Sequence, residues 1–227
     1  MNTLSLLRGF RFIDSLFPSG GYAYSSGLEA AVQGGAVTDA VSIQRYVREL
    51  LEHGMAGREA LAVALAHDAA MAADLNSVIC VDQNLEAMKL DHTSRVASRQ
   101  MGRQVLRIAA ESNKAVIMKR YLTSVERDLS PGHLAVTLGV TLSVCGWLKH
   151  ETVGAFLYQF AAGLISAGMK LLPLGQREAQ RILDSWLPLI DEISHRATTA
   201  QDMMSFAPIQ DIYAMRHGRL VSRLFRS

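Results

Sequence analysis

Apolar side chains recur along this chain at spacings of three and four residues, which is the period of an α-helix. After a glycine pair, Thr38 and Asp39 can cap a helix, because short polar side chains accept hydrogen bonds from the first free backbone N–H groups. One stripe of that helix is apolar: Ile43, Val47, Leu50 and Leu51. Apolar and polar residues rarely alternate over several positions, so strands are not indicated. The pattern predicts an all-helical fold.

Residues that form turns or end helices divide the rest of the chain. His53-Gly54 is expected to interrupt the first helix. A later helix is expected to begin near Asp82 and to run through Ile108. Pro188 is expected to halt an amphipathic helix, and a short helix is expected after Pro208.

The stretch 133–172 is apolar and rich in glycine. Glycine inside a helix costs about 1 kcal/mol relative to alanine, so its repeated use indicates helices that approach each other closely. The glycines concerned are Gly139, Gly146, Gly154, Gly163 and Gly168. Two uncharged runs lie here, 134–148 and 152–169. We interpret both as core helices rather than membrane spans, because the first is too short for a bilayer and the second contains Gln159 and several glycines.

Composition supports an ordered core and narrows the function. Hydrophobic residues make up 49% of the 227 residues and charged residues 19%, and the net charge of +2 gives no argument for nucleic-acid binding. Two cysteines give no disulfide framework, and the N-terminus does not resemble a signal peptide, so we expect a cytoplasmic protein. With no repeat or linker found, we expect one all-α domain over 1–227, a bundle of about ten helices.

Sequence motifs of catalysis are missing. There is no phosphate-binding loop, no GxSxG nucleophile motif and no His or Cys spacing typical of a zinc or nickel site. We therefore expect no enzyme, no catalytic residue, no metal site and no cofactor. A metal site shared across a symmetric dimer stays open, because it would need only one or two ligands per chain.

Two segments and one helix face are unusual. Residues 13–29 combine glycines, hydroxyls and three aromatics, which suits either a structural turn or an interface. The end, 212–227, mixes arginines with apolar residues and is either a last helix folded on the core or a tail that orders on a partner. Four arginines recur at every fourth position and form either a solvated face or a docking face for an acidic partner: Arg95, Arg99, Arg103 and Arg107.

These segments resemble the UreF family of urease accessory proteins, in order and over nearly the whole chain. The matching elements are DSLFPSGGYAYSSGLE at 14–29, RVAS followed by MGR at 95–103, His133 with Gly139, PLGQ at 173–176, and the C-terminal signature from 208 to the end. Three positions depart from the family pattern. Tyr24 stands where His is frequent, Gly218 where Glu is frequent, and Val221 where Tyr is frequent. The first puts a metal-relay role for that position in doubt, and the other two change the charge and bulk of the tail.

The resemblance implies an all-helical homodimer that acts as a chaperone in nickel insertion. It implies that the protein binds UreD (also called UreH) and recruits the GTPase UreG before the assembly acts on apo-urease. Residues 216–227 are then a docking tail that orders on UreD, and Tyr22 with Arg223 recruits UreG. The implied partner-binding residues are Tyr22, Met215, His217, Leu220, Arg223, Leu224, Phe225, Arg226 and Ser227.

Two alternatives accompany this interpretation. The protein could regulate or activate GTP hydrolysis by UreG, with Arg223 or the row of four arginines reaching the nucleotide, because an arginine can stabilise charge on a transferring phosphate. The second and weaker alternative is that it lines a passage for nickel with residues such as His133 or Glu29, but we favour a helix-start or buried hydrogen-bonding role for His133.

Overall fold

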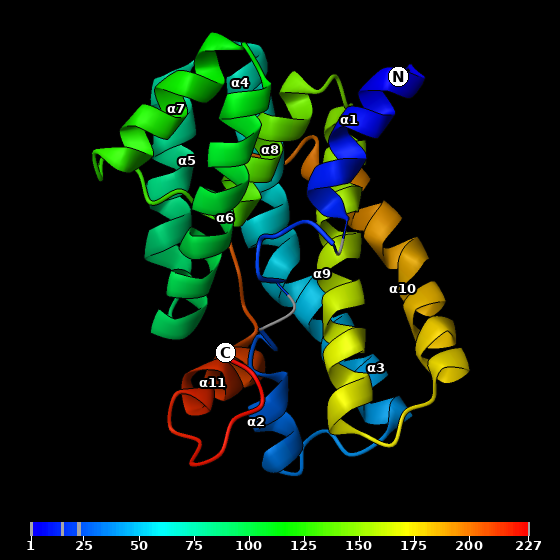
Figure 1. Cartoon of the computed structure of the whole chain (residues 1–227). Coiled ribbons are helices and arrows are strands. Elements are labelled where there is room, and N and C mark those ends of the chain that lie inside the picture. The colour runs from blue at the N-terminus through cyan, green and yellow to red at the C-terminus, as the bar shows by residue number, and fades with distance from the viewer. Residues whose placement is uncertain (1, 15, 22–23, 227) are drawn as a thin grey trace.

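All regular secondary structure is helical in the part of the chain that its structure, a computed structural model, describes: residues 2–14, 16–21 and 24–226 (Figure 1). No strand occurs among these residues. The all-α prediction is therefore confirmed. In chain order the elements are α1 (Thr3–Ile13), α2 (Leu28–Gln33), α3 (Ala40–Glu49), the π-helix η2 (Leu50–Ala60), α4 (Leu61–Met71), α5 (Leu75–Met88), α6 (His92–Ser112), α7 (Val116–Glu126), α8 (Leu134–Val144), α9 (Lys149–Leu171), α10 (Gln176–Ala197) and α11 (Pro208–His217).

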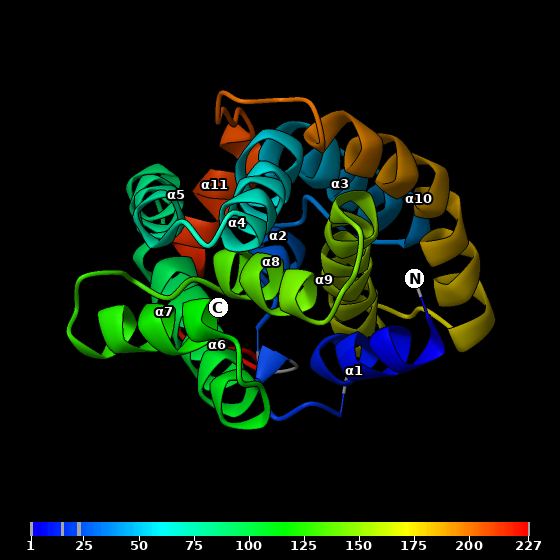
Figure 2. The same cartoon turned by 90° about the horizontal axis from the view of Figure 1, so that it is seen from above.

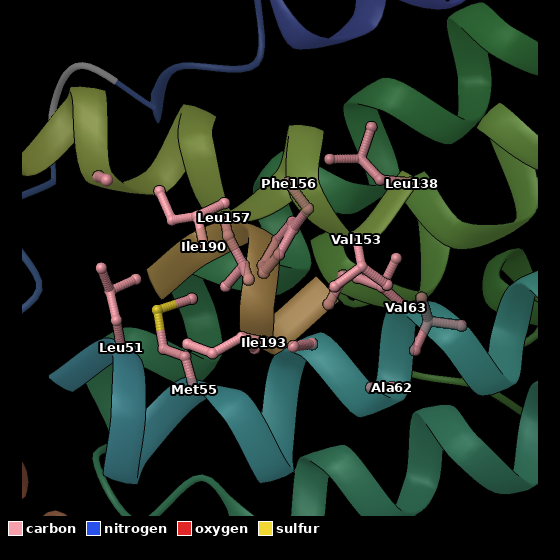
Figure 3. Packing of buried hydrophobic residues seen from close by; sticks show 14 of the residues in the cluster. Leu51, Met55, Ala62, Val63, Leu138, Val153, Phe156, Leu157, Ile190 and Ile193 are labelled. Carbon is pink, nitrogen blue, oxygen red and sulfur yellow. The ribbon is translucent and has the colours of Figure 1, made fainter. Parts of the chain in front are cut away.

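Helix α8 occupies the centre of the bundle. Its residues from Ala135 to Ser143 are all buried, and α4, α6 and α9 surround it (Figure 2). A helix that is apolar on every side is stable in water only when it is enclosed in this way. Side chains from η2, α4, α8, α9 and α10 meet beside it in one continuous core (Figure 3).

Helix α9 crosses the bundle between α8 and α10. It is the one helix among the described residues that is long and apolar enough, by length and composition alone, to cross a membrane. Half of its apolar stretch is buried inside the chain. The packing supports its interpretation as a core helix.

The interruption predicted at His53-Gly54 is wrong. Helices α3, η2 and α4 follow one another without a gap, and the hydrogen bonding changes to the π pattern over Leu50–Ala60. The π-helix leaves the carbonyls of His53 and Gly57 available, and they accept hydrogen bonds from the backbone N–H groups of Phe206 and Met204, both at 2.9 Å. Segments distant in sequence thus decide the local geometry.

Two other predicted helix boundaries are also wrong. Asp82 lies inside α5, and the helix that follows begins at His92 with Asp91 as its cap. Helix α10 continues through Pro188. The proline costs about 3 kcal/mol in a helix interior, but the buried residues on both sides of it, including Trp186 and Ile190, pack on the core and compensate.

Close helix contacts at glycine are confirmed at some positions and not at others. A Cβ at Gly139 would lie 2.5 Å from the carbonyl oxygen of Val63 in α4, and one at Gly168 would lie 2.3 Å from Ile43. Gly163 in α9 has nothing within 4 Å of that point and is exposed. The same residue type therefore has different roles in two neighbouring helices.

Gly139→Ala and Gly163→Ala should change stability in opposite directions. The methyl group at position 139 meets a backbone oxygen that cannot move away, so we expect a loss of about 1–3 kcal/mol. At position 163 the alanine replaces a flexible residue in an open helix face, so we expect a gain of about 0.5–1 kcal/mol. Urea unfolding of both variants measures this. Equal effects would contradict the packing at Gly139.

Candidate partner-docking site

Helix α11, which leads into the tail (residues 216–227), is fixed to the bundle by an ion cluster of four residues: Arg58, Glu59, Lys89 and Asp211. The Nε of Arg58 donates to Oε2 of Glu59 at 2.9 Å, and its Nη1 lies 3.6 Å from Oδ1 of Asp211 in α11. Lys89 Nζ contacts the other oxygen of Glu59. Arg58, Glu59 and Lys89 are buried, so this cluster holds the first turn of α11 against η2.

The charge on Glu59 is held by its two cationic neighbours. Burial disfavours a carboxylate, but Arg58 and Lys89 oppose this and bring the pKa of Glu59 to about 2. The group is therefore ionised over the whole neutral range. Removing one partner of such a cluster leaves an uncompensated buried charge, which is far more costly than losing a surface ion pair.

A second buried carboxylate, Glu29 of α2, holds the tail itself. His217 Nε2 lies 2.9 Å from Oε2 of Glu29, and the backbone N–H groups of Leu224 and Phe225 donate to the same carboxylate at 2.6 and 3.1 Å. Burial raises the pKa of Glu29, but these hydrogen bonds and the His217 charge outweigh it and hold the pKa below its usual range. One side chain therefore binds both the end of α11 and the chain terminus.

The tail runs beside α2, and α2 packs beside the lower part of α9 (Figure 1). Gln33 of α2 donates to the carbonyl of Ser222 at 3.1 Å, and Lys170 of α9 lies 5.4 Å from the centre of the Phe225 ring. A hollow of about 450 Å³ lies between the tail and part of the signature segment (residues 14–29), which is attached to the tail at Glu29. Its lining is Ser19, Gly20, Tyr24, Gln100, Lys170, Leu224, Phe225 and Arg226. The two sequence-predicted segments are thus brought together.

The structure divides the predicted partner-binding set by exposure. His217 and Phe225 are buried within this chain, and Leu220 is half-buried. Four side chains of the set are exposed: Met215, Arg223, Leu224 and Arg226. Tyr22 and Ser227 lie outside the described residues. The tail's backbone is ordered on its own chain, whereas much of its side-chain surface faces solvent, so the partner contacts stay a prediction.

Three of the four arginines in the row on α6 have partners inside the chain. Arg99 Nη1 lies 3.4 Å from Glu86, Arg95 donates to the Lys89 carbonyl at 3.1 Å, and Arg103 lies 3.2 Å from Asp128. These contacts favour the interpretation of the row as a structural, partly solvated face.

The residues considered for a nickel passage are also engaged. Both ring nitrogens of His133 have neighbours, Ser98 Oγ at 3.1 Å and Glu86 Oε2 at 2.8 Å, and burial together with the Lys89 charge lowers its pKa to about 3. His133 is therefore neutral and hydrogen-bonded at the start of α8. Among the described residues, no three His, Cys, Asp or Glu side chains group as metal ligands.

The ion cluster and the role of Glu29 were not predicted from the sequence. Glu59 follows Arg58 directly, which resembles any solvated charge pair, and the other two members of the cluster come from positions 89 and 211. The only available signal for Glu29 is its place at the end of the signature segment, where a lone carboxylate follows a run of glycine and hydroxyl residues.

Comparison with known proteins identifies relatives of this chain by sequence. Residues 37–186 match the sequence profile of the family described as UreF. A urease accessory protein UreF from Actinobacillus pleuropneumoniae is 30% identical over 217 residues, which cover 95% of this chain and 96% of that protein. Proteins with the same name from Cereibacter sphaeroides and Bacillus sp. are 32% and 28% identical, and each comparison covers 98% of this chain and 99% of the relative.

Glu59→Gln should destabilise the fold by about 3–5 kcal/mol, because the buried Lys89 then loses its counter-charge and the buried Arg58 keeps only Asp211. Glu126→Gln, on an exposed face of α7, is the matched control and should change stability by less than about 0.5 kcal/mol. Urea unfolding at neutral pH measures both. A loss below about 1 kcal/mol for Glu59→Gln would contradict the cluster's role.

Wild type and Glu59→Gln should also differ in the pH dependence of their stability. The folded pKa of Glu59, about 2, lies below its ordinary value of 4.5, so its stabilising contribution is complete above about pH 4.5 and is lost as the pH falls toward 2. The stability difference between wild type and Glu59→Gln should therefore shrink as the pH falls through this range. A difference that stays constant between about pH 5 and pH 3 would contradict the assignment.

Proposed function

The chain belongs to the UreF family of urease accessory proteins, and from this premise we propose that it is a docking protein that binds UreD (UreH) through its tail and recruits the GTPase UreG. As a urease accessory protein it assists the maturation of urease and is not itself an enzyme. The proposal includes a cytoplasmic homodimer that takes part in nickel insertion into apo-urease. Membership of the family supports these parts.

The observation that carries the proposal is an exposed apolar ridge on α11 that leads into the tail. Ile209, Ile212 and Met215 follow one another at every third position, on one face of the helix, and are 55%, 43% and 44% exposed. Leu224 adds a further apolar side chain at 63%, with Arg223 and Arg226 on either side of Leu224 and Phe225. Apolar groups gathered in this way on an ordered surface are typical of a protein-binding site, and the arginines suit carboxylates at its rim.

The site also has a rigid base. Helix α11 is fixed by the ion cluster at Asp211 and by Gln210, whose side chain donates to the Tyr46 carbonyl at 3.4 Å. A docking surface that is already ordered loses less conformational entropy on binding than a flexible one. This supports the proposal that the docking surface is formed before the partner binds.

Deletion of residues 216–227 should leave a folded protein that no longer binds UreD. Among the described residues of this segment, only His217 and Phe225 are buried, so the core around α8 stays intact. Met215→Asp should weaken binding by about tenfold or more, because it places a charge on the ridge. Val116→Asp is the matched control, since Val116 is 69% exposed on α7, far from α11 (Figure 1).

Co-purification and titration with UreD measure these effects, with circular dichroism to verify folding. Full binding by the truncated protein would contradict the tail assignment. Equal losses for Met215→Asp and Val116→Asp would contradict the position of the ridge.

A second candidate function, regulation of GTP hydrolysis by UreG, is favoured by one observation. Arg223 is exposed on the tail, whereas Arg95, Arg99 and Arg103 of the α6 row contact groups of their own chain. An arginine that reaches a nucleotide in a partner's site can raise the rate of hydrolysis by about 10³ to 10⁵. Arg223 is therefore the better candidate for that role.

If Arg223 acts in this way, GTP hydrolysis by purified UreG should rise on addition of this protein together with UreD, and Arg223→Lys should abolish most of the increase. Lysine keeps the charge but lacks the planar group that binds two phosphate oxygens. Arg120→Lys, on the exposed face of α7 and outside the row of four arginines, is the control. An unchanged hydrolysis rate would leave docking as the function.

A further inference from the structure

We infer that Glu29 is the positioning residue of the docking surface: its carboxylate sets the conformation in which the tail is presented to the partner. The inference rests on the proposed function, because partner binding is what the carboxylate is inferred to support. Glu29 is the last residue of the signature segment. Its side chain does not contact a partner directly, because it is only 2% exposed.

Three donors converge on this one carboxylate. Oε1 accepts from the Leu224 N–H at 2.6 Å, and Oε2 accepts from the Phe225 N–H at 3.1 Å and lies 2.9 Å from His217 Nε2. Two successive backbone N–H groups and the last residue of α11 are thus tied to one point. The chain between His217 and Leu224 forms a closed loop, because both of its ends are attached to Glu29.

Glu29 holds the tail mainly by its backbone, which leaves other side chains available. The Leu224 N–H is bound, yet the Leu224 side chain is 63% exposed, and Val221 in the closed loop is fully exposed. Phe225 points the other way, into the core beneath Lys170. Fixing the backbone between an inward and an outward side chain also fixes the directions in which Arg223 and Arg226 leave it.

The neighbourhood of Glu29 is built for close contact with α11. Gly27, two residues earlier, has φ +84°, and a Cβ there would lie 2.7 Å from the backbone nitrogen of Ala214 in α11. A glycine at this position therefore lets the helix approach α2. The closeness of α11 in turn brings His217 within hydrogen-bonding distance of Glu29, so the signature segment and the tail form one surface.

A carboxylate is chemically required at this position. Glutamine has nearly the same shape, but its amide offers one oxygen as acceptor, and its NH₂ group is a donor. With three donors converging, at least one would face the NH₂ of glutamine. Glu29→Gln should therefore release the tail without introducing a cavity, while hydrogen bonds to a charged acceptor, which are stronger than neutral ones, are lost.

The test is the affinity for UreD and the amide hydrogen exchange of the tail, both measured on the full-length protein. We expect Glu29→Gln to lower the affinity about tenfold or more and to speed exchange at Leu224 and Phe225 by at least as large a factor, while exchange in α8 stays unchanged. The affinity falls with the fraction of chains whose tail is in the binding conformation, whereas exchange rises with the fraction whose tail is released, so an ordered tail loses protection by more than it loses affinity. Glu178→Gln, on the exposed face of α10, is the matched control.

A second variant removes the donor of one of these hydrogen bonds and leaves Glu29 unchanged. Leu224→Pro removes the N–H that Oε1 of Glu29 accepts and leaves the core untouched, since the Leu224 side chain is exposed. It should reproduce the effects of Glu29→Gln on exchange at Phe225, and its effect should not add to them in the double variant.

The outcomes separate the inference from the proposed function. If deletion of residues 216–227 abolishes UreD binding but Glu29→Gln binds like wild type, the inference is overturned and the proposed function stands. Unchanged exchange at Leu224 and Phe225 in Glu29→Gln overturns the inference as well. If the deletion itself leaves binding intact, the tail assignment in the proposed function fails, and Glu29 then positions no docking surface.

Discussion

The arrangement of this protein's surface depends on one buried carboxylate that satisfies donors from the far end of the chain. Glu29 lies in α2, and the donors that reach it lie 188 to 196 positions later. A buried carboxylate is tolerated only when it is paired and hydrogen-bonded, so the position of the tail and the position of α2 are set together. The fold thereby places its most distinctive N-terminal segment and its basic, apolar terminus side by side, with a hollow between them.

The helical bundle provides the support for that arrangement. Helix α8 is enclosed by its neighbours, and the π-helix η2 presents carbonyl groups to the extended segment that leads into α11. The ion cluster then ties Asp211 of α11 to Arg58 of η2. Buried charges of this kind contribute little net stability compared with apolar residues, but they tolerate few alternative positions of their partners. The docking function that we propose uses this positional restriction directly, because a surface that is already ordered loses less conformational entropy when a partner binds.

Local signals made the helical class and several boundaries predictable from the sequence. Asp39 was predicted as a helix cap, and its side chain does accept from the N–H of Ser42. The contact at Gly139 also follows from the sequence, since a glycine retained in a helix indicates close approach.

The features that could not be predicted are decided by contacts between segments distant in sequence. Asp82 resembled a helix start, yet it is buried within α5 and accepts hydrogen bonds from Tyr121, Ser130 and the backbone at 132–133. Likewise, His53-Gly54 resembled a break, yet the helix continues through it. The backbone N–H groups of Phe206 and Met204, far along the chain, donate to carbonyls of this helix at His53 and Gly57. Of the candidate site, the two segments were recognised, but the carboxylate that joins them was not, because a single glutamate carries no spacing pattern.

The central claim is that Glu29 and the end of α11 act as one unit, and a double-mutant cycle on the unfolding free energy tests it most directly. The cycle compares Glu29→Gln, His217→Ala and the double variant with wild type in urea. The account predicts a coupling energy of at least about 1 kcal/mol, because each residue is the buried partner of the other. Effects that add within about 0.3–0.5 kcal/mol would contradict it.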